Sequence, residues 1–294
     1  MGLIRKEDIH ESLLNSLSNP NLLINGDFQV WQRGEVFTTQ DTEDTGLMLY
    51  TADRWHFWNY NPSYPRRSKV EKYNGHFKFT SIGNDWLRQH IEADLSGVPL
   101  TLSISVKGSE GSTIMLQMED AKSSSDESIT IVANKNYSCT GGYDTFVLNI
   151  PAFNYSKFPT VVIRSESIDV FEIEWVKLEY GSIATTFLPR LYGEELALCQ
   201  RYYEILDHSE RMSTSLSSIS YEMNVPFRVP KRTNPTQIIT TGMINDNIDI
   251  ASRILAYTSS ILTFGCYIAA ETNDPLLVVG NRISFKGYAD SEIY

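Results

Sequence analysis

Five aromatic rings lie within ten residues of this sequence, which is a density that suits the binding of a ligand with flat apolar faces. They are Trp55, Phe57, Trp58, Tyr60 and Tyr64. In a strand, Trp55 and Phe57 point to one face while Trp58 points to the other, so a single core buries both sets only if the strand is central. One set of rings is therefore expected to be exposed or to lie at an interface.

Exposed aromatic rings stack on the apolar face of a sugar while neighbouring polar side chains bond its hydroxyl groups. The aromatic cluster and a second strand that begins at Trp86 supply the candidates. The predicted ligand contacts are Trp58, Tyr60, Tyr64, Trp86 and Arg88. The alternative is that these rings fill the core or an interface between copies of the chain.

Patterns typical of enzymes do not occur. The sequence has no G-x-S-x-G, no P-loop and no H-E-x-x-H. The five histidines are scattered without the spacing of metal ligands. His56 and His90 could meet across strands, although a surface histidine or a hydrogen-bonded core histidine is the commoner case. We therefore expect a protein without catalytic activity.

Composition narrows the class of partner. The net charge of −11 argues against nucleic acid or an anionic membrane, because both are bound by basic surfaces. No apolar run approaches the roughly 18 residues of a membrane span, and the first residues lack the apolar stretch of a secretory signal. Cys139, Cys199 and Cys266 are far apart and are expected to be buried free thiols in a protein made in a reducing cytoplasm.

The elements that would position the candidate residues are strands. From residue 21 to 189 short alternating segments are separated by turn signals every eight to twelve residues, and Asn74-Gly75 is the strongest hairpin signal. The predicted strands are Leu22–Val30, Arg54–Tyr60, Val70–Tyr73, Phe77–Thr80, Trp86–Glu92, Leu100–Val106, Ile114–Met118, Ile129–Val132, Phe146–Ile150, Thr160–Arg164 and Val170–Leu178. This pattern predicts an all-β fold, a sandwich or a jelly roll.

Two helices and a second β-rich region complete the expected organisation. Residues 1–20 repeat apolar side chains near the helical period and end at Asn19-Pro20. A short linking helix is expected within 190–206, after Pro189. Residues 207–294 have strand patterns to their end and predict a C-terminal β-sandwich, with the C-terminus tied into a sheet.

The run from Val176 to Tyr203 resembles a pattern of bacteriophage tail fibre and tail appendage proteins, V-x-L-E-x-G-x-x-A-T-x-F-x-x-R followed by E-L-x-L-C-Q-R-Y-Y. Matching positions are Val176, Leu178, Glu179, Gly181, Ala184, Thr185, Phe187, Arg190, Glu195, Leu196, Leu198, Cys199, Gln200, Arg201, Tyr202 and Tyr203. The opening segment 21–34 and the Ala-Asp-Arg-Trp at 52–55 are similar too. A second signature, F-x-x-P-M-R-x-x-P-T, is matched from Phe227 to Thr236, with Lys231 in place of Met.

This resemblance implies a jelly roll similar to carbohydrate-binding modules, in a virion protein that is a homotrimer and attaches the tail to a host surface glycan. Residues 1–20 would then bundle with copies of themselves or dock on other phage tail proteins; the alternative is that they pack on their own domain. Such jelly rolls often hold a structural calcium, for which Asn25, Asp27 and Glu174 are the candidates. A structural adaptor that links tail proteins is the alternative function, and a glycan-cleaving tailspike is the third.

Overall fold

The structure is a computed structural model that describes residues 18–38, 48–59, 68–121, 129–211, 220–246, 248–251, 254–258, 260–269 and 281–292. The chain divides into two compact units, one made by residues up to Glu195 and the other by Leu196–Glu292. The helix predicted for residues 1–20 lies outside the described residues, apart from its last three positions, which are irregular.

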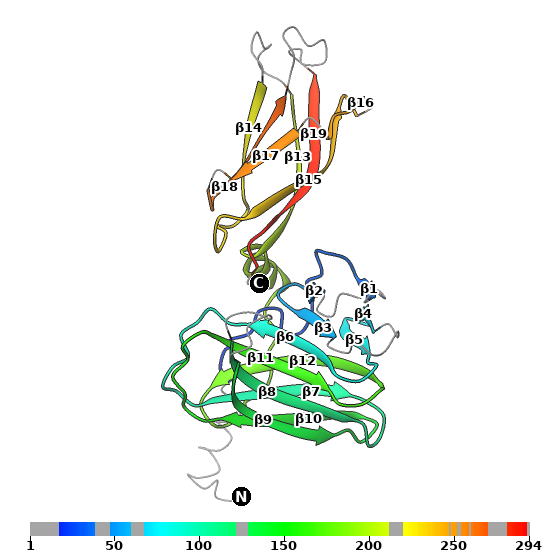
Figure 1. The fold of residues 1–294 in the computed structure, drawn as a ribbon, viewed down its shortest axis with the longest axis vertical. Coiled ribbons are helices and arrows are strands. Elements are labelled where there is room, and N and C mark those ends of the chain that lie inside the picture. Colours follow the sequence, from blue (N-terminus) through cyan, green and yellow to red (C-terminus); the bar gives the residue numbers. More distant parts are fainter. Residues whose placement is uncertain are drawn as a thin grey trace, which may run out of the picture. The chain divides into compact units, whose positions relative to one another are not determined.

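The first unit is a sandwich of two six-stranded antiparallel sheets (Figure 1). Sheet A has the order β1 (Val36–Thr38), β4 (Lys69–Tyr73), β5 (His76–Thr80), β12 (Val170–Tyr180), β7 (Leu100–Lys107), β10 (Tyr143–Ile150). Sheet B has the order β2 (Met48–Tyr50), β3 (His56–Asn59), β6 (Asp85–His90), β11 (Phe158–Ser165), β8 (Thr113–Ala121), β9 (Thr130–Ser138). Most successive strands change sheets, as in a jelly roll. The predicted all-β class is confirmed.

Alternating side chains build the core between the sheets. In β7, Leu100, Leu102, Ile104 and Val106 are fully buried in one apolar cluster, while the residues between them face outwards. The same period in β6 turns Leu87 into this cluster and Trp86, Arg88 and His90 to the opposite face. The predicted alternation in both strands is confirmed.

The hairpin between β4 and β5 has the predicted turn. Asn74 and Gly75 have positive φ angles of 51° and 84°, the conformation of a type I′ turn, which matches the twist of the flanking strands. Asn and Gly adopt this left-handed conformation at little cost, so the sequence fixes the register of the pair locally.

The first predicted strand, Leu22–Val30, is wrong. Residues 18–35 contain no strand, and positive φ angles of 56° at both Asn25 and Phe28 turn the backbone out of the extended conformation. Side chains replace a strand partner here: the Ile24 N–H donates to the Gln89 side chain at 2.8 Å, and the Val30 N–H donates to Asn25 Oδ1 at 3.0 Å. Leu23 and Phe28 are still buried in the core.

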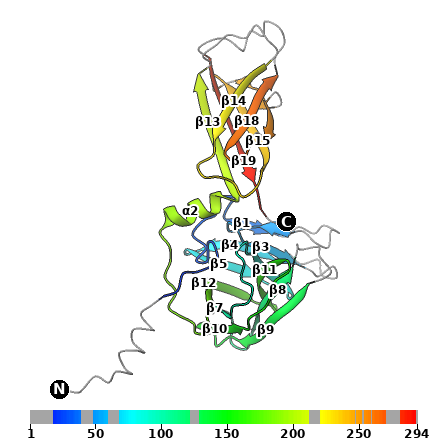
Figure 2. The ribbon, with the colours of Figure 1, turned by 90° about the vertical axis from the view of Figure 1, so that its left-hand side faces the viewer.

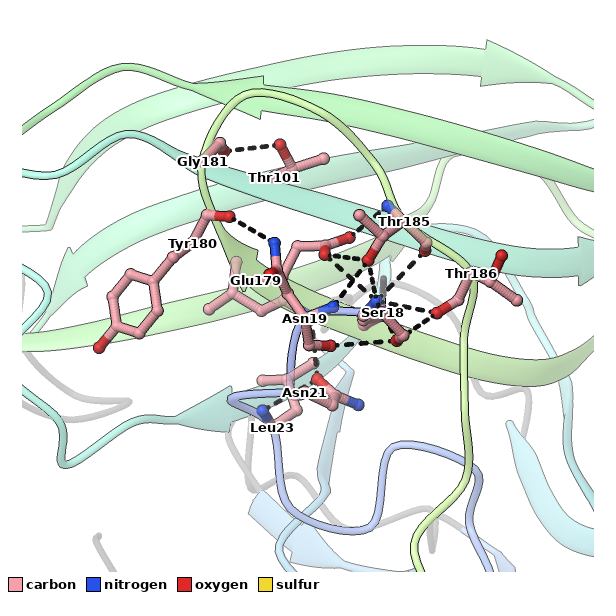
Figure 3. A network of polar contacts seen from close by, with 12 residues as sticks. Ser18, Asn19, Asn21, Leu23, Thr101, Glu179, Tyr180, Gly181, Thr185 and Thr186 are labelled. Atoms are coloured by element: carbon pink, nitrogen blue, oxygen red, sulfur yellow. Dashed lines mark hydrogen bonds and ion pairs between the residues drawn. The ribbon is translucent and has the colours of Figure 1, made fainter. Parts of the chain in front are cut away.

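A buried ion pair lies on the outer face of β12. Lys177 Nζ is 3.2 Å from Glu179 Oε2, and the two side chains are only 1% and 0% exposed. Gly181, with φ of 97°, then turns the chain back across this face (Figure 3). Trp175 stacks on Phe187 at 5.0 Å between ring centroids, which holds the returning segment on the sheet.

The pair is saturated with hydrogen bonds, many of them shown in Figure 3. Lys177 Nζ donates to Thr185 Oγ1 at 2.6 Å, to the Thr186 carbonyl at 3.0 Å and to Ser18 Oγ at 3.2 Å. Glu179 Oε1 accepts the Thr185 N–H at 2.8 Å. The Leu-Glu-x-Gly-x-x-x-Thr part of the sequence pattern is therefore a structural clamp that joins the last strand of this unit to its first residues.

The second unit is a smaller sandwich whose strands run side by side in Figure 2. One sheet has the order β13 (Tyr203–Arg211), β19 (Arg282–Asp290), β15 (Thr236–Ile244), β16 (Ile248–Asp249), and the other β14 (Ser220–Pro226), β18 (Thr263–Ala269), β17 (Ile254–Thr258). Helix α2 (Tyr192–Gln200), labelled in Figure 2, contains the boundary between the units. Strand β19 lies between two partners, so the end of the chain is tied into a sheet as predicted.

Lys231 in this unit is buried, and its ammonium bonds Glu204 and the Gln200 carbonyl. The departure from Met at this position thus places a charge in the interior together with its partner. Burial lowers the pKa of Lys231, and the hydrogen bond to Glu204 opposes that shift.

We expect Lys177→Met to lower the free energy of unfolding of the first unit by about 3–5 kcal/mol, because it leaves the buried Glu179 carboxylate without its cation. All five tryptophans, Trp31, Trp55, Trp58, Trp86 and Trp175, belong to this unit, so tryptophan fluorescence in urea reports its unfolding. The control is Lys72→Met, in the exposed pair with Glu35, for which a change within about 0.5 kcal/mol is expected. Equal losses in the two variants would contradict the clamp.

Candidate ligand-binding site

The outer face of sheet B brings together residues from four neighbouring strands. Antiparallel register sets Trp58 of β3 opposite Trp86 of β6, and His56 opposite Arg88. On the other side of β6, Thr160 of β11 lies opposite both His90 and Glu119 of β8. Side chains that are far apart in the sequence therefore lie side by side on one face of the sheet, where those of His56, Arg88, His90, Thr160 and Glu119 are buried.

Two tryptophans form an aromatic pair at one end of this surface. Trp58 and Trp86 are half-buried, with ring centroids 5.2 Å apart and planes at 78°. The guanidinium groups of Arg88 and Arg164 lie over the Trp86 ring at 5.7 and 5.2 Å. The pair thus presents aromatic surface next to hydrogen-bond donors.

Beside this pair the surface is polar and yet buried. Arg88 and Glu119 form an ion pair through Nη2 and Oε2, and their side chains are 0% and 1% exposed. The second oxygen of Glu119 accepts a hydrogen bond from the amide of Gln117, which is also buried. Charges removed from water in this way are costly unless their remaining hydrogen-bonding groups find partners.

The two histidines of this face are neutral at neutral pH. Their rings lie 5.2 Å apart, and His90 Nδ1 is 2.7 Å from Thr160 Oγ1. Burial, reinforced by the cations of Arg88 and Arg54, lowers the pKa of His90 to about 3 and holds that of His56 well below its usual range. A neutral imidazole offers one donor and one acceptor nitrogen.

Several buried nitrogen atoms of this cluster have no hydrogen-bond partner within the described part of the chain. They are both ring nitrogens of His56, Nε2 of His90, and Nε and Nη1 of Arg88. Leaving a buried polar group unsatisfied costs about 1–3 kcal/mol each, so such groups are rare and call for a water or a ligand. We name this set, together with Glu119, Trp58 and Trp86, the sheet B cluster.

The structure places three of the five predicted ligand contacts in this cluster: Trp58, Trp86 and Arg88. Tyr60 and Tyr64 lie outside the described residues. Trp55 and Phe57 face the core, on the opposite side of the strand from Trp58.

Sequence reasoning missed Glu119 and Gln117, whereas the meeting of His56 and His90 across strands, which it had raised, is confirmed. The alternation of Gln117 and Glu119 with Leu116 and Met118 marks one polar face of β8. The register between β8, β11 and β6 that brings this face to Arg88 has no signal in the sequence.

The predicted calcium ligands make other contacts. The Asn25 amide donates to the backbone carbonyls of Val30 and Asp53, Asp27 accepts from Gln29, and Glu174 accepts from Ser105 at 2.5 Å. Among the described residues, no group of three or more His, Cys, Asp and Glu side chains could hold a metal ion. The calcium site stays a prediction.

Polar groups on the outer face of sheet A have hydrogen-bond partners, unlike the nitrogens of the sheet B cluster. His76 Nδ1 lies 2.9 Å from Glu172 Oε1 and 3.0 Å from Tyr143 Oη. Burial would raise the pKa of Glu172, but hydrogen bonds from Tyr143 and His76 hold it below its usual value. None of these three side chains has a buried atom without a partner.

Comparisons with known proteins do not assign this chain to a family. No protein-family model matches the chain, and no curated protein is found as a relative. Similar solved structures include a CBM4 structure (15% identity, 53% of this chain and 98% of that chain, TM-score 0.38) and TmCBM61 in complex with β-1,4-galactotriose (15%, 55% and 99%, 0.29). A third is the enzymatically active domain of tailspike protein 4 of bacteriophage CBA120, at 13% identity, 55% of this chain, 21% of that chain and TM-score 0.34.

With TM-scores below 0.5, these likenesses by themselves establish neither the fold nor the activity of this chain. The sandwich described above follows from its own strand order and register. Within the described residues no helix is long and apolar enough to cross a membrane. Cys139 and Cys199 are buried free thiols, as predicted; the side chain of Cys266 lies outside the described part.

The neutral histidines predict that the first unit loses stability in acid. The pKa of His90 is about 3 in the fold against an ordinary 6.5, so between these values the unfolded chain binds a proton that the folded chain does not. Stability is full above about pH 6.5 and falls as the pH drops, by up to about 1.4 kcal/mol per pH unit for each histidine.

Urea unfolding followed by tryptophan fluorescence at several pH values between 7 and 4 measures this slope. His90→Gln, which cannot titrate, is expected to show a shallower slope by about 1.4 kcal/mol per pH unit. The matched control His208→Gln alters a half-buried histidine of the second unit and is expected to leave the slope unchanged. A His90→Gln slope equal to that of the wild type would show that this histidine is not held neutral.

Proposed function

We propose that this chain is a non-enzymatic glycan-binding protein of a phage tail, and that its first unit holds a host surface glycan on the sheet B cluster. The observation that carries the proposal is the coincidence, on one sheet face, of an aromatic pair and buried polar atoms without partners. An aromatic surface with a few convergent polar groups is the usual composition of a small-ligand site.

The two parts of the cluster would do different work. The rings of Trp58 and Trp86 would stack on the C–H surface of a sugar ring, which would exclude water from both. Nitrogens of His56, His90 and Arg88 would then exchange hydrogen bonds with the hydroxyl and ring oxygens of the same residue. The neutral ring of His56 can donate to one sugar oxygen and accept from a hydroxyl group, whereas His90 offers only Nε2, because its Nδ1 bonds Thr160.

No chemistry beyond binding is part of the proposal. The one carboxylate of the cluster, Glu119, is engaged by both Arg88 and Gln117, so it is not poised as a general acid or as a nucleophile. A glycosidase needs a second carboxylate about 5–10 Å away across the substrate, and among the described residues the cluster contains no other.

The virion role rests on the sequence resemblance at residues 176–203 and 227–236. It includes a homotrimer, attached to other tail proteins through residues 1–20. The alternative of a purely structural adaptor shares these sequence patterns, and binding separates the two. An adaptor has no use for unpartnered nitrogens beside an aromatic pair, which favours the glycan-binding role.

We expect Trp58→Ala and Trp86→Ala each to weaken attachment of the purified protein to intact cells of the bacterial host by about ten-fold or more, since each removes a stacking surface worth about 1–3 kcal/mol. Fluorescently labelled protein and flow cytometry measure attachment, after light scattering has fixed the oligomer mass.

Tyr73→Ala is the matched control, because Tyr73 is an exposed aromatic residue on β4 of sheet A. It should leave attachment unchanged, and circular dichroism should show all three variants folded. If the wild-type protein does not attach at all, the adaptor role replaces the proposed one. If Tyr73→Ala alone abolishes attachment, the site lies on sheet A.

A further inference from the structure

We infer that the glycan held by the sheet B cluster carries an anionic substituent, a carboxylate or a phosphate, whose oxygens lie against Arg88 and His56. This inference rests on the proposed function and names the class of its ligand. It follows from the hydrogen-bond donors and acceptors that the cluster leaves open.

Unpartnered donors outnumber acceptors in the cluster. A guanidinium carries five N–H bonds, and Arg88 uses only its Nη2 group, towards Glu119. The N–H of Nε and the two of Nη1 are buried without partners among the described residues. A neutral sugar hydroxyl meets such a group as a weak acceptor, whereas a carboxylate or phosphate oxygen makes charge-assisted bonds about twice as strong.

His56 adds a donor to the same place. Within the described residues both of its ring nitrogens are unpartnered, and its ring lies 5.2 Å from that of His90. The Thr160 hydroxyl donates to the Phe158 carbonyl and so accepts from His90 Nδ1, which leaves His90 Nε2 as an acceptor and the N–H of His56 as the donor that can meet an oxyanion beside those of Arg88. The carboxylate of the cluster is already engaged, because Oε1 and Oε2 of Glu119 accept hydrogen bonds from Gln117 and Arg88.

Guanidinium groups lie close to the histidines although the chain as a whole has a net charge of −11. Arg88 and Arg54 both lower the pKa of His56 and of His90. Glu119 pairs with Arg88 and Glu166 pairs with Arg164, so the preference for an anion rests on the open N–H groups of Arg88 and not on an excess of positive charge.

A glycan array with paired probes tests the inference on the wild-type protein. The probes are oligogalacturonate and sialyllactose next to their carboxyl-reduced forms, and a phosphorylated mannose oligosaccharide next to its dephosphorylated product. Calorimetry then measures each hit. We expect an acidic probe to bind and removal of its anionic group to weaken binding about ten-fold or more, the value of one charge-assisted hydrogen bond.

Arg88→Lys separates the anion contact from folding. It keeps a cation beside Glu119 but removes Nε and Nη1, so we expect the preference for the acidic member of a pair to fall to about three-fold or less. Arg282→Lys, in an exposed pair with Asp246 in the second unit, is the matched control and should keep the full preference. Circular dichroism of both variants establishes that they are folded.

The outcomes separate the two proposals. Tight binding of neutral probes, with no gain from an anionic group, overturns the anionic ligand and leaves glycan binding intact. Binding to no probe of either kind overturns both. An acidic preference that Arg88→Lys does not reduce overturns the assignment to this cluster, and the phosphate and carboxylate pairs tell the two anions apart.

Discussion

Both sheets of the first unit must bury polar side chains on the face turned away from the core, and how those side chains are partnered organises the whole unit. On sheet A the pair of Lys177 and Glu179 is saturated by a returning segment, through Thr185 and Ser18. On sheet B the pair of Arg88 and Glu119 is not: in the part of the chain that the structure describes, nitrogens of Arg88 and of the neighbouring histidines have no partner. Since a buried charge is costly unless its hydrogen bonds are complete, the first arrangement supports the fold and the second marks the candidate site.

Local patterns predicted much of the fold because they depend on neighbours in the sequence. Alternation in β7 reveals which residues enter the core, and Asn74-Gly75 sets the turn of the β4–β5 hairpin through the backbone conformations that these residues tolerate. The same reasoning failed at residues 22–30. There the apolar side chains are buried as in a strand, but Asn25 and Gln89 supply hydrogen bonds that a neighbouring strand would have made. Periodicity detects burial and does not detect which group satisfies the backbone.

The candidate site could be predicted only in part, for the same reason. Aromatic density identified Trp58 and Trp86, and the period of β6 adds Arg88 to the same face. Glu119 enters through the order β6-β11-β8, which is a non-local pairing that a single sequence does not encode in any short motif. The meeting of His56 and His90 was foreseeable from alternation, but their neutrality was not, since it depends on burial and on guanidinium groups brought from other strands.

Buried atoms without hydrogen-bond partners also affect the stability of the first unit. Their desolvation lowers the free energy of unfolding of the free protein. The first unit is therefore less stable than it would be with a fully hydrogen-bonded or apolar face at the sheet B cluster. The apolar cluster between the sheets and the saturated clamp on β12 are what make that loss tolerable. A ligand that completes the hydrogen bonds of Arg88 would recover part of it on binding, because it associates with the folded state alone. The same unsatisfied nitrogens would therefore lower the stability of the free unit and contribute to its affinity for a ligand.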